Sequence, residues 1–352
     1  MTAPAISVIM AAYNGAALIG ETIASLRAQT FADFEVIIVD DCSTDTTRDV
    51  LRAIDDPRFH VIESQVNQGP VRTRNLAFVQ ARGRYIAALD QDDLCHPDRL
   101  GAQRAYLDAH PDTVLAATAT RQLEAGITRP SALPALTSAT LVEWMLNICN
   151  PLVWSSVMLR RDAAQHLSPF TRPELLYAED FDLYHRLAPF GRIARLDAEL
   201  VTYRSHGGGA SQRFTNTMND NAARVLAARH EGLFGGEAKA RAALLTRHVM
   251  RRVPVPDRDQ LAMLGDTLVR LQENFLARTA PGEEDIRLIR WETARLWGRI
   301  GRAGLRSGSI DLGDAVAVRP DHLGLGYARI DELVMSQLIG GMRRVQRAIA
   351  DR

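Results

Sequence analysis

The sequence predicts an α/β protein: a doubly wound, mostly parallel sheet with helices on both faces, followed by a mainly helical C-terminal region. Two observations predict this fold class. Short, nearly continuous apolar runs alternate with helix-like segments in the first part of the chain, and this order is typical of a parallel sheet buried on both sides. Beyond Arg213 the chain is rich in Ala, Leu and Arg, which favour helices. The 352 residues are enough for about two domains.

The predicted elements of the first part follow from their apolar patterns. Ile19, Ile23 and Leu26 repeat at the spacing of one helix face. The strands are expected at Ile6–Ala11, Glu35–Asp40, Phe59–Ile62 and Tyr85–Leu89, and the helices at Gly15–Thr30, Thr44–Ile54, Pro70–Ala81 and Pro97–His110.

The rest of the chain divides into two further parts. Residues 131–213 are irregular and rich in proline, and their clearest elements are a strand at Ser155–Leu159 and a helix over Phe181–Leu187. Residues 214–352 form the helical region. We therefore expect an α/β part at 1–130, a second part of the same domain at 131–213, and a separate C-terminal region at 214–352.

The composition excludes several function classes. Lys+Arg and Asp+Glu both total 42, whereas nucleic-acid binders normally carry a basic excess. Lys239 is the only lysine, and its sequence context is not that of a Walker-type phosphate loop. The 3 widely spaced cysteines predict free thiols rather than a disulfide framework or a zinc site. Without a signal-peptide pattern or an apolar run of about 18 residues, we expect a cytoplasmic protein, and contact with the inner face of the membrane is left open.

Polar residues follow three of the four predicted strands. The first strand is followed by Tyr13-Asn14, the second ends in Asp40-Asp41 and the fourth in Asp90-Gln91-Asp92-Asp93. Ligands of open α/β sheets bind at the carboxyl ends of the strands, and several acids at one edge repel one another unless a cation or ligand pairs them. The Asp-x-Asp spacing lets two carboxylates approach one Mg²⁺ or Mn²⁺ that is shared with a nucleotide diphosphate.

Other side chains near this edge could hold the nucleotide. The G-x-G-x-x-G fingerprint of dinucleotide-binding proteins is missing after the first strand. Tyr13 offers a face for stacking on a base and Asn14 an amide, although an aromatic residue such as Tyr13, taken alone, is more often a packing residue. Arg72 and Arg74 could reach phosphates, orient the acids, or lie on an exposed helix face.

Three features further along the chain suggest chemistry. Glu179-Asp180 begins a predicted helix, whose N-terminal dipole favours an ionised carboxylate that can act as a base; the alternative is a pair of capping acids. His206 precedes a run of glycines, which suits a lid, and histidine is also a metal or phosphate ligand. Trp154, just before Ser155, either stacks on a sugar or packs in the interior.

The C-terminal segment, 340–352, mixes apolar residues with Arg343, Arg344 and Arg347. This pattern suits a helix on a membrane surface. From sequence alone, the pattern better suits an ordinary amphipathic helix that packs on the body of the protein or on a partner subunit, so a homo-oligomer formed through the C-terminal helices is left open.

A series of motifs between Ile6 and Ser211, about three-fifths of the chain, resembles family 2 glycosyltransferases. Ala11 stands where a proline is common in that family and Cys42 where a glycine is usual, but neither change removes a functional side chain. In order, the motifs are ISVIM…YN (6–14), SLRAQTFADFE (25–35), VDDCSTD (39–45), NQG…RN (67–75), ARGRYI (81–86), DQDD (90–93), PDRL (97–100), SS (155–156), EDFDL (179–183) and YRSH (203–206).

The resemblance implies a GT-A fold, a nucleotide-sugar donor, inversion by one direct displacement, and a divalent metal, Mn²⁺ or Mg²⁺. A UDP-sugar is the favoured donor. Position by position, it implies that Asp41 contacts the base and that Asp90 contacts the ribose or a metal-bound water. The expected donor site is completed by Ala11, Tyr13, Asn14, Arg74 and Gln91. The expected metal ligand is Asp92, with Asp93 and His206 as further candidates.

On the acceptor side, the resemblance implies that Asp180 is the base. Glu179 would hold the acceptor or stabilise the site, and Trp154 and Ser155 would lie near the acceptor. We therefore expect an inverting, metal-dependent glycosyltransferase that acts on a saccharide or lipid-linked saccharide in polysaccharide or cell-surface glycan synthesis. The alternatives are a sugar nucleotidyltransferase and an inactive nucleotide-sugar-binding module.

Overall fold

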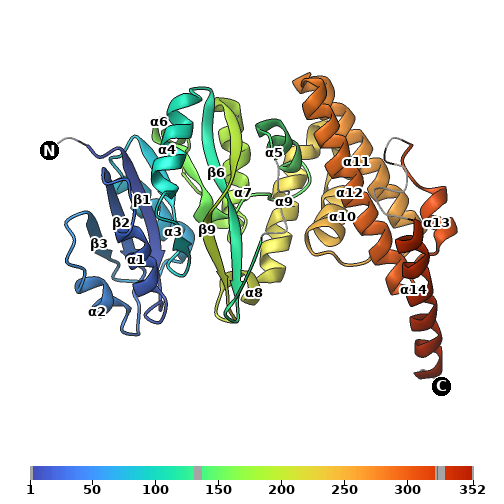
Figure 1. Ribbon diagram of the computed structural model, residues 1–352, viewed down its shortest axis with the longest axis horizontal. Coiled ribbons are helices and arrows are strands. Elements are labelled where there is room, and N and C mark those ends of the chain that lie inside the picture. Colours follow the sequence, from blue (N-terminus) through green and yellow to red (C-terminus); the bar gives the residue numbers. More distant parts are fainter. Residues whose placement is uncertain (1–2, 131–136, 322, 324–329, 351–352) are drawn as a thin grey trace. The chain divides into compact units, whose positions relative to one another are not determined.

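The computed structural model describes residues 3–130, 137–321, 323 and 330–350 (Figure 1). The chain forms two compact units: Met1–Glu143 with Asn150–Met218, and Trp144–Cys149 with Asn219–Arg352. The sequence placed a boundary after Arg213. It did not indicate that the short internal segment Trp144–Cys149 belongs with the helical unit.

Within the described ranges, the first unit is built on one mixed sheet of nine strands, in the order β3-β2-β1-β4-β8-β6-β9-β5, with β7 paired to β6. The four strands predicted at the start of the chain are confirmed and run parallel to one another. They are β1 (Ile6–Ala12), β2 (Phe34–Asp40), β3 (Phe59–Glu63) and β4 (Tyr85–Ala88).

The other half of the sheet differs from the prediction. The strand expected at Ser155–Leu159 is wrong in position, because Trp154–Ser156 form a 3₁₀ turn and the strand β8 is Met158–Arg160, antiparallel to β4. Two long strands, which pair in parallel, were not predicted: β6 (Thr113–Glu124) and β9 (Arg192–Ser205). The apolar run of β6 is short, Val114–Ala117, and β9 mixes apolar with charged residues, so neither strand was clearly marked along its length. The remaining short strands are β5 (Leu94–Cys95) and β7 (Ile127–Pro130).

Helices cover both faces of the parallel strands, as predicted. Ile6, Val8 and Met10 of β1 belong to one buried cluster with the apolar residues of α1 and α4. Ile9 points to the opposite face, where α3 packs on β1 and β2. The helices of this unit are α1 (Ile19–Arg27), α2 (Thr47–Arg52), α3 (Pro70–Gln80), α4 (Arg99–Ala109), α6 (Arg161–Gln165), α7 (Glu179–Leu187) and α8 (Ala210–Arg213).

The second unit is mainly helical, which confirms the prediction for the C-terminal region. Figure 1 shows its long helices α11 and α12 beside each other. Trp144 explains why an internal segment joins this unit, since its side chain is fully buried and its Nε1–H donates to Thr293 Oγ1 at 3.0 Å.

None of the helices in the described ranges is both long enough and apolar enough to cross a membrane. The helices of the second unit are α10 (Ala238–Leu244), α11 (Arg258–Thr279), α12 (Glu283–Ser307), α13 (Leu312–Ala317) and α14 (Ile330–Ala350), while α5 (Ala139–Met145) and α9 (Thr215–Phe234) cross the division between the units.

Candidate active site

The loops after β1, β2 and β4 are tied together by side-chain hydrogen bonds. The backbone N–H of Tyr13 donates to Gln91 Oε1 at 2.9 Å, and Gln91 Nε2 donates back to the carbonyl of Tyr13 at 3.0 Å. Asn14 joins the β2 loop, because its Oδ1 accepts from the backbone N–H of Thr44 at 2.8 Å and its own N–H donates to Ser43 Oγ at 3.0 Å. The polar ends of three strands therefore meet at one edge of the sheet.

Within this edge, Tyr13 keeps 45% of its surface exposed, whereas Ala11 is half-buried in β1. Asn14 adopts the left-handed backbone conformation, with φ 46°, and so does Cys42, with φ 62°. The left-handed region carries a steric cost for residues other than glycine. Cys42 therefore occupies a backbone position that suits the glycine usual in the resembling family.

Asp41 is buried, with 2% of its surface exposed, and supports the turn before α3. Its two carboxylate oxygens accept from the backbone N–H groups of Gln68, at 2.9 Å, and Gly69, at 2.8 Å. A carboxylate can accept about four hydrogen bonds. Asp41 could therefore also accept a hydrogen bond from a ligand while it keeps the two from Gln68 and Gly69.

Arg74 bridges two acids that are far apart in the sequence. Its Nη2 lies 2.9 Å from Asp90 Oδ1, and its Nη1 donates to Glu179 Oε1. The guanidinium also lies over the ring of Trp154, 5.2 Å from the ring centre. Burial opposes the charge of Arg74, but Asp90 and Glu179 outweigh it and raise the pKa of Arg74. The sequence left three roles open for Arg74: contact with phosphates, orientation of the acids, or a place on an exposed helix face. Its contacts with Asp90 and Glu179 support the second role.

The acids after β4 meet the end of β9. His206 Nε2 lies 2.8 Å from Asp92 Oδ2, and Asp93 Oδ1 accepts from the backbone N–H of Arg204 at 2.8 Å. Burial and the neighbouring Asp90 raise the pKa of Asp92, and His206 opposes this shift. Burial beside Asp92 and Asp90 raises the pKa of Asp93 well above its usual range. The residues the structure describes contain no group of three or more His, Cys, Asp or Glu that could hold a metal, so Asp92 and His206 are a pair.

Asp180 and Glu179 lie side by side at the start of α7. Asp180 Oδ2 accepts from Asn150 Nδ2 at 2.9 Å, and its Oδ1 accepts from the backbone N–H of Phe181 at 2.7 Å. Burial, reinforced by the charge of Glu179, raises the pKa of Asp180 to about 7. The helix N-terminus was expected to keep this carboxyl ionised. The structure corrects that argument, because loss of solvent outweighs the backbone hydrogen bond.

Burial also raises the pKa of Glu179, although the charge of Arg74 opposes the shift. The next acid of the helix, Asp182, is already paired with Arg186, at 2.7 Å, and Arg172, at 3.3 Å. Among the described residues, Asp180 is therefore the acid of this helix that combines part exposure, no arginine partner and a pKa near neutrality.

Trp154 and Ser155 hold the site together, in contrast to the expected contact with an acceptor. Trp154 is 7% exposed and its ring lies under Arg74. Ser155 is fully buried, and its Oγ accepts from the backbone N–H of Asp90 at 3.0 Å. With so little exposed surface, both side chains contact the protein interior.

A buried pair on α4, Arg99 and Gln103, was missed by the sequence analysis. Arg99 Nη2 donates to the carbonyls of Ala88, at 2.9 Å, and Val157, at 3.1 Å, and its Nε donates to Gln103 Oε1 at 2.9 Å. These bonds hold the end of β4, just before Asp90. The motif at 97–100 contains Arg99, but a lone arginine on a helix usually lies at the surface.

Several buried polar atoms of this region have no hydrogen-bond partner among the described residues, including Arg74 Nε, Asp93 Oδ2, Glu179 Oε2, Arg204 Nε and the hydroxyl of Tyr184. Buried polar groups are normally satisfied by protein, water or a ligand. Their concentration around the acids supports a site that is completed by bound molecules.

Comparison with known proteins agrees with this geometry. The family model for glycosyl transferase family 2 matches residues 7–167. The chain is 32% identical over 212 residues, 58% of this chain and 79% of the relative, to the Escherichia coli protein WfaP, described as a UDP-Glc:α-D-GlcNAc-diphosphoundecaprenol β-1,3-glucosyltransferase. With several other curated relatives the match is confined to 105–133 residues, and the chain spans less than half of their length.

Two solved structures share the fold. Residues 1–349 of TarS from S. aureus, in complex with UDP-GlcNAc, are 20% identical with a TM-score of 0.54, over 97% of this chain and 92% of that one. The mannosyltransferase PcManGT from Pyrobaculum calidifontis, in complex with GDP-Man and Mn²⁺, is 18% identical with a TM-score of 0.51, over 84% of this chain and 81% of that one. WfaP is more than 30% identical and is matched over most of its length, and the family motifs lie together at one edge of a GT-A-like sheet. The chain is therefore a glycosyltransferase and belongs to glycosyl transferase family 2.

Proposed function

We propose that this protein transfers a sugar from a nucleotide-diphosphate sugar to a hydroxyl of a saccharide acceptor, with inversion and with the help of a divalent metal. The observation that carries the proposal is the carboxyl of Asp180, whose pKa is raised to about 7 beside the bridge from Glu179 through Arg74 to Asp90. A general base works best when its pKa lies near the operating pH.

The direct displacement needs one base, on the acceptor side. In the proposed reaction the acceptor hydroxyl gives its proton to Asp180 as its oxygen bonds to the anomeric carbon and the nucleoside diphosphate leaves. Asn150 and the backbone N–H of Phe181 each hold one oxygen of Asp180, so the carboxylate is kept in one orientation. Arg74 pairs directly with Glu179 and Asp90 and not with Asp180.

The residues at the end of β4 fit a divalent metal shared with the donor. Asp92 and His206 already touch. Burial, reinforced by the charges of the neighbouring acids, raises the pKa of Asp92 and Asp93, and a cation would relieve the repulsion among these acids. Two protein ligands are enough where diphosphate oxygens and waters supply the rest. Mn²⁺ or Mg²⁺ held by Asp92 and His206 would neutralise the charge of the departing diphosphate.

The donor is proposed to be a UDP-sugar, bound by Tyr13, Asn14, Asp41, Asp90 and Gln91 at the same edge. UDP-Glc in the description of WfaP and UDP-GlcNAc in the TarS complex support this choice. The diphosphoundecaprenol-linked saccharide named for WfaP supports a lipid-linked saccharide as the acceptor, and with it a role in polysaccharide or cell-surface glycan synthesis at the inner face of the membrane.

Replacing Asp92 by Ala is expected to abolish the Mn²⁺-dependent gain in UDP affinity, because the diphosphate loses its shared cation. Calorimetric titration of UDP with and without Mn²⁺ measures this effect directly. Asp55→Ala, an exposed acid in the loop before β3, is the matched control and should bind as the wild type does. Unchanged Mn²⁺ dependence in Asp92→Ala would remove Asp92 from the metal site.

The two alternative functions have less support. A sugar nucleotidyltransferase needs a basic, Gly-rich phosphate segment after the first strand, but residues 12–15 are Ala-Tyr-Asn-Gly and are bound to Gln91, Ser43 and Thr44. An inactive binding module would have no need for Asp180, whose surroundings give it the pKa of a base. The family assignment also favours transfer of a sugar.

Helix α14 supports peripheral contact with a membrane. Its apolar residues Val334, Met335, Leu338 and Met342 are 43–60% exposed, while Arg302 and Arg306 of α12 bind Glu332 and Ser336 on another face. The sequence from Leu333 to Ala350 contains three arginines and no acid. An exposed apolar stripe next to basic residues suits an anionic lipid surface.

Leu338→Asp is therefore expected to abolish co-sedimentation of the protein with phosphatidylglycerol vesicles, since the change puts a charge in the apolar stripe. Binding to phosphatidylcholine vesicles should be weak for the wild type as well. Val316→Asp, at a 41% exposed position of α13, serves as the control. If size-exclusion chromatography instead shows that Leu338→Asp converts an oligomer into monomers, the stripe is a subunit interface.

A further inference from the structure

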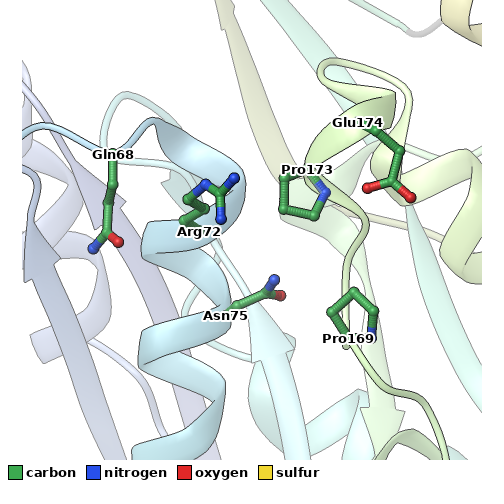
Figure 2. Close-up of a pocket in the computed structure, with 6 residues that line it drawn as sticks. All are labelled: Gln68, Arg72, Asn75, Pro169, Pro173 and Glu174. Atoms are coloured by element: carbon green, nitrogen blue, oxygen red, sulfur yellow. The ribbon is translucent and has the colours of Figure 1, made fainter.

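An open pocket of about 610 Å³ lies beside the proposed donor site, between α3 and the segment 169–174 (Figure 2). Its volume is within the ~300–1,000 Å³ typical of small-molecule sites. Figure 2 shows Gln68, Arg72 and Asn75 along one wall and the prolines with Glu174 along the other. The pocket is lined by Gln68, Arg72, Asn75, Pro169, Pro173 and Glu174.

The pocket is preformed, because both of its walls are held by hydrogen bonds. Asn75 Nδ2 donates to the carbonyl of Thr171 at 2.8 Å, and Asn75 Oδ1 accepts from the N–H and the hydroxyl of Thr171 at 2.9 and 2.7 Å. From the other side, Arg186 of α7 donates to the carbonyls of Pro169, at 2.9 Å, and Phe170, at 2.7 Å. The ring of Phe170 stacks on Phe78 of α3, with the ring centres 4.0 Å apart.

The chemistry of the lining suits a saccharide. Within the described part of the chain, the exposed guanidinium of Arg72 has no hydrogen-bond or ion-pair partner, and the amide of Gln68 is also exposed. These groups can donate to ring and hydroxyl oxygens, and the carboxylate of Glu174 can accept from hydroxyl groups. Pro169 and Pro173 add apolar surface for the C–H faces of a sugar ring. A simple anion would fit less well, because Glu174 lines the wall opposite Arg72.

The position of the pocket relates it to the acceptor. Its Asn75 follows Arg74, which binds Glu179, and its other wall runs on through Pro173–Leu175 to Asp180 at the start of α7. We infer that this pocket is an acceptor subsite that binds a saccharide unit of the acceptor away from the hydroxyl that reacts, with Arg72 and Gln68 as its hydrogen-bond donors. The inference rests on the proposed function. In it, the residues of this pocket take the place of Trp154 and Ser155 as the contacts of the acceptor.

Saturation-transfer NMR with a panel of glucose, GlcNAc, galactose, cellobiose, chitobiose and lactose, in the presence of UDP and Mn²⁺, tests this assignment on the full chain. We expect at least one of these sugars to bind the wild type. Arg72→Ala should weaken that binding by about tenfold or more, as for loss of a charge-assisted hydrogen bond, and Gln68→Ala by less. Arg129→Ala, an exposed arginine on β7, should bind the sugar as the wild type does.

Calorimetry with UDP separates this inference from the proposed function. All four proteins should bind UDP with the same affinity within about twofold. Absence of any sugar signal with the wild type, or an equal signal with Arg72→Ala, overturns the subsite. A selective loss of UDP affinity in Arg72→Ala overturns it as well, because the pocket would then belong to the donor. Failure of the wild type to bind UDP at all contradicts the proposed function instead.

Discussion

Asp180→Asn is expected to lower turnover by ~10²–10⁴-fold while donor affinity stays nearly intact. The amide keeps the shape of the side chain but cannot take the proton of the acceptor hydroxyl. Asp180 touches Asn150 and its own helix, not the residues proposed to hold the nucleotide. Single-turnover transfer, with UDP affinity measured by calorimetry, separates the chemical step from binding.

The pH dependence gives an independent readout of the same residue. Because a base must be ionised, and the pKa of Asp180 is raised to about 7, wild-type turnover should rise about tenfold per pH unit below that value and level off above it. Asp180→Asn should lack this rise. A raised carboxyl pKa means that Asp180 stabilises the fold at low pH and that this contribution is lost as the pH rises through about 7. The Asn variant should therefore be at least as stable as the wild type at pH 8.

Asp182→Asn is the matched control, because Asp182 lies on the same helix but is paired with Arg172 and Arg186. It should lose some stability and keep its turnover. If Asp180→Asn transfers sugar within a few-fold of the wild type, Asp180 only caps α7. Glu179 would then be the remaining candidate for the base.

Arg74→Ala is expected to lower the free energy of unfolding by about 3–5 kcal/mol, the usual effect of removing one partner of a buried ion pair. The reason is that Glu179, 3% exposed, and the half-buried Asp90 both lose the cation that compensates them. Arg74→Lys should recover only part of this loss, since one ammonium cannot reproduce two hydrogen bonds from separate nitrogens. Urea unfolding of the wild type and both variants measures the differences.

A second substitution tests the cause of that loss. In Arg74→Ala/Glu179→Gln the buried charge is removed together with its partner, so we expect part of the lost stability to return. Additive effects of the two changes would show that Arg74 stabilises the fold by packing on Trp154 and not by pairing with Glu179. A loss below about 1 kcal/mol in Arg74→Ala would show that water already compensates the two acids.

The sequence alone determined the parallel half of the sheet and its covering helices. The strands β1, β2 and β4 are apolar runs that are buried over most of their length, the less buried β3 still carries Phe59, Val61 and Ile62, and helices such as α1 carry their apolar face at a fixed spacing. These signals lie within a few consecutive residues, so they can be read without knowing the fold. The same local logic predicted that the polar ends of β1, β2 and β4 meet at one edge. The hydrogen bonds between Tyr13 and Gln91 and between Thr44 and Asn14 confirm that meeting.

Only the tertiary structure decided the partners of the charged residues. Arg74 meets Glu179, and His206 meets Asp92, across more than one hundred positions of sequence. Glu179 begins α7 and His206 directly follows β9, so both meetings require the later part of the chain to fold back onto the parallel strands. The pKa of Asp180 likewise could not be read from its place at a helix start. A helix N-terminus lowers the pKa of a carboxyl, burial beside a second acid raises it, and the balance depends on how much solvent the folded chain excludes.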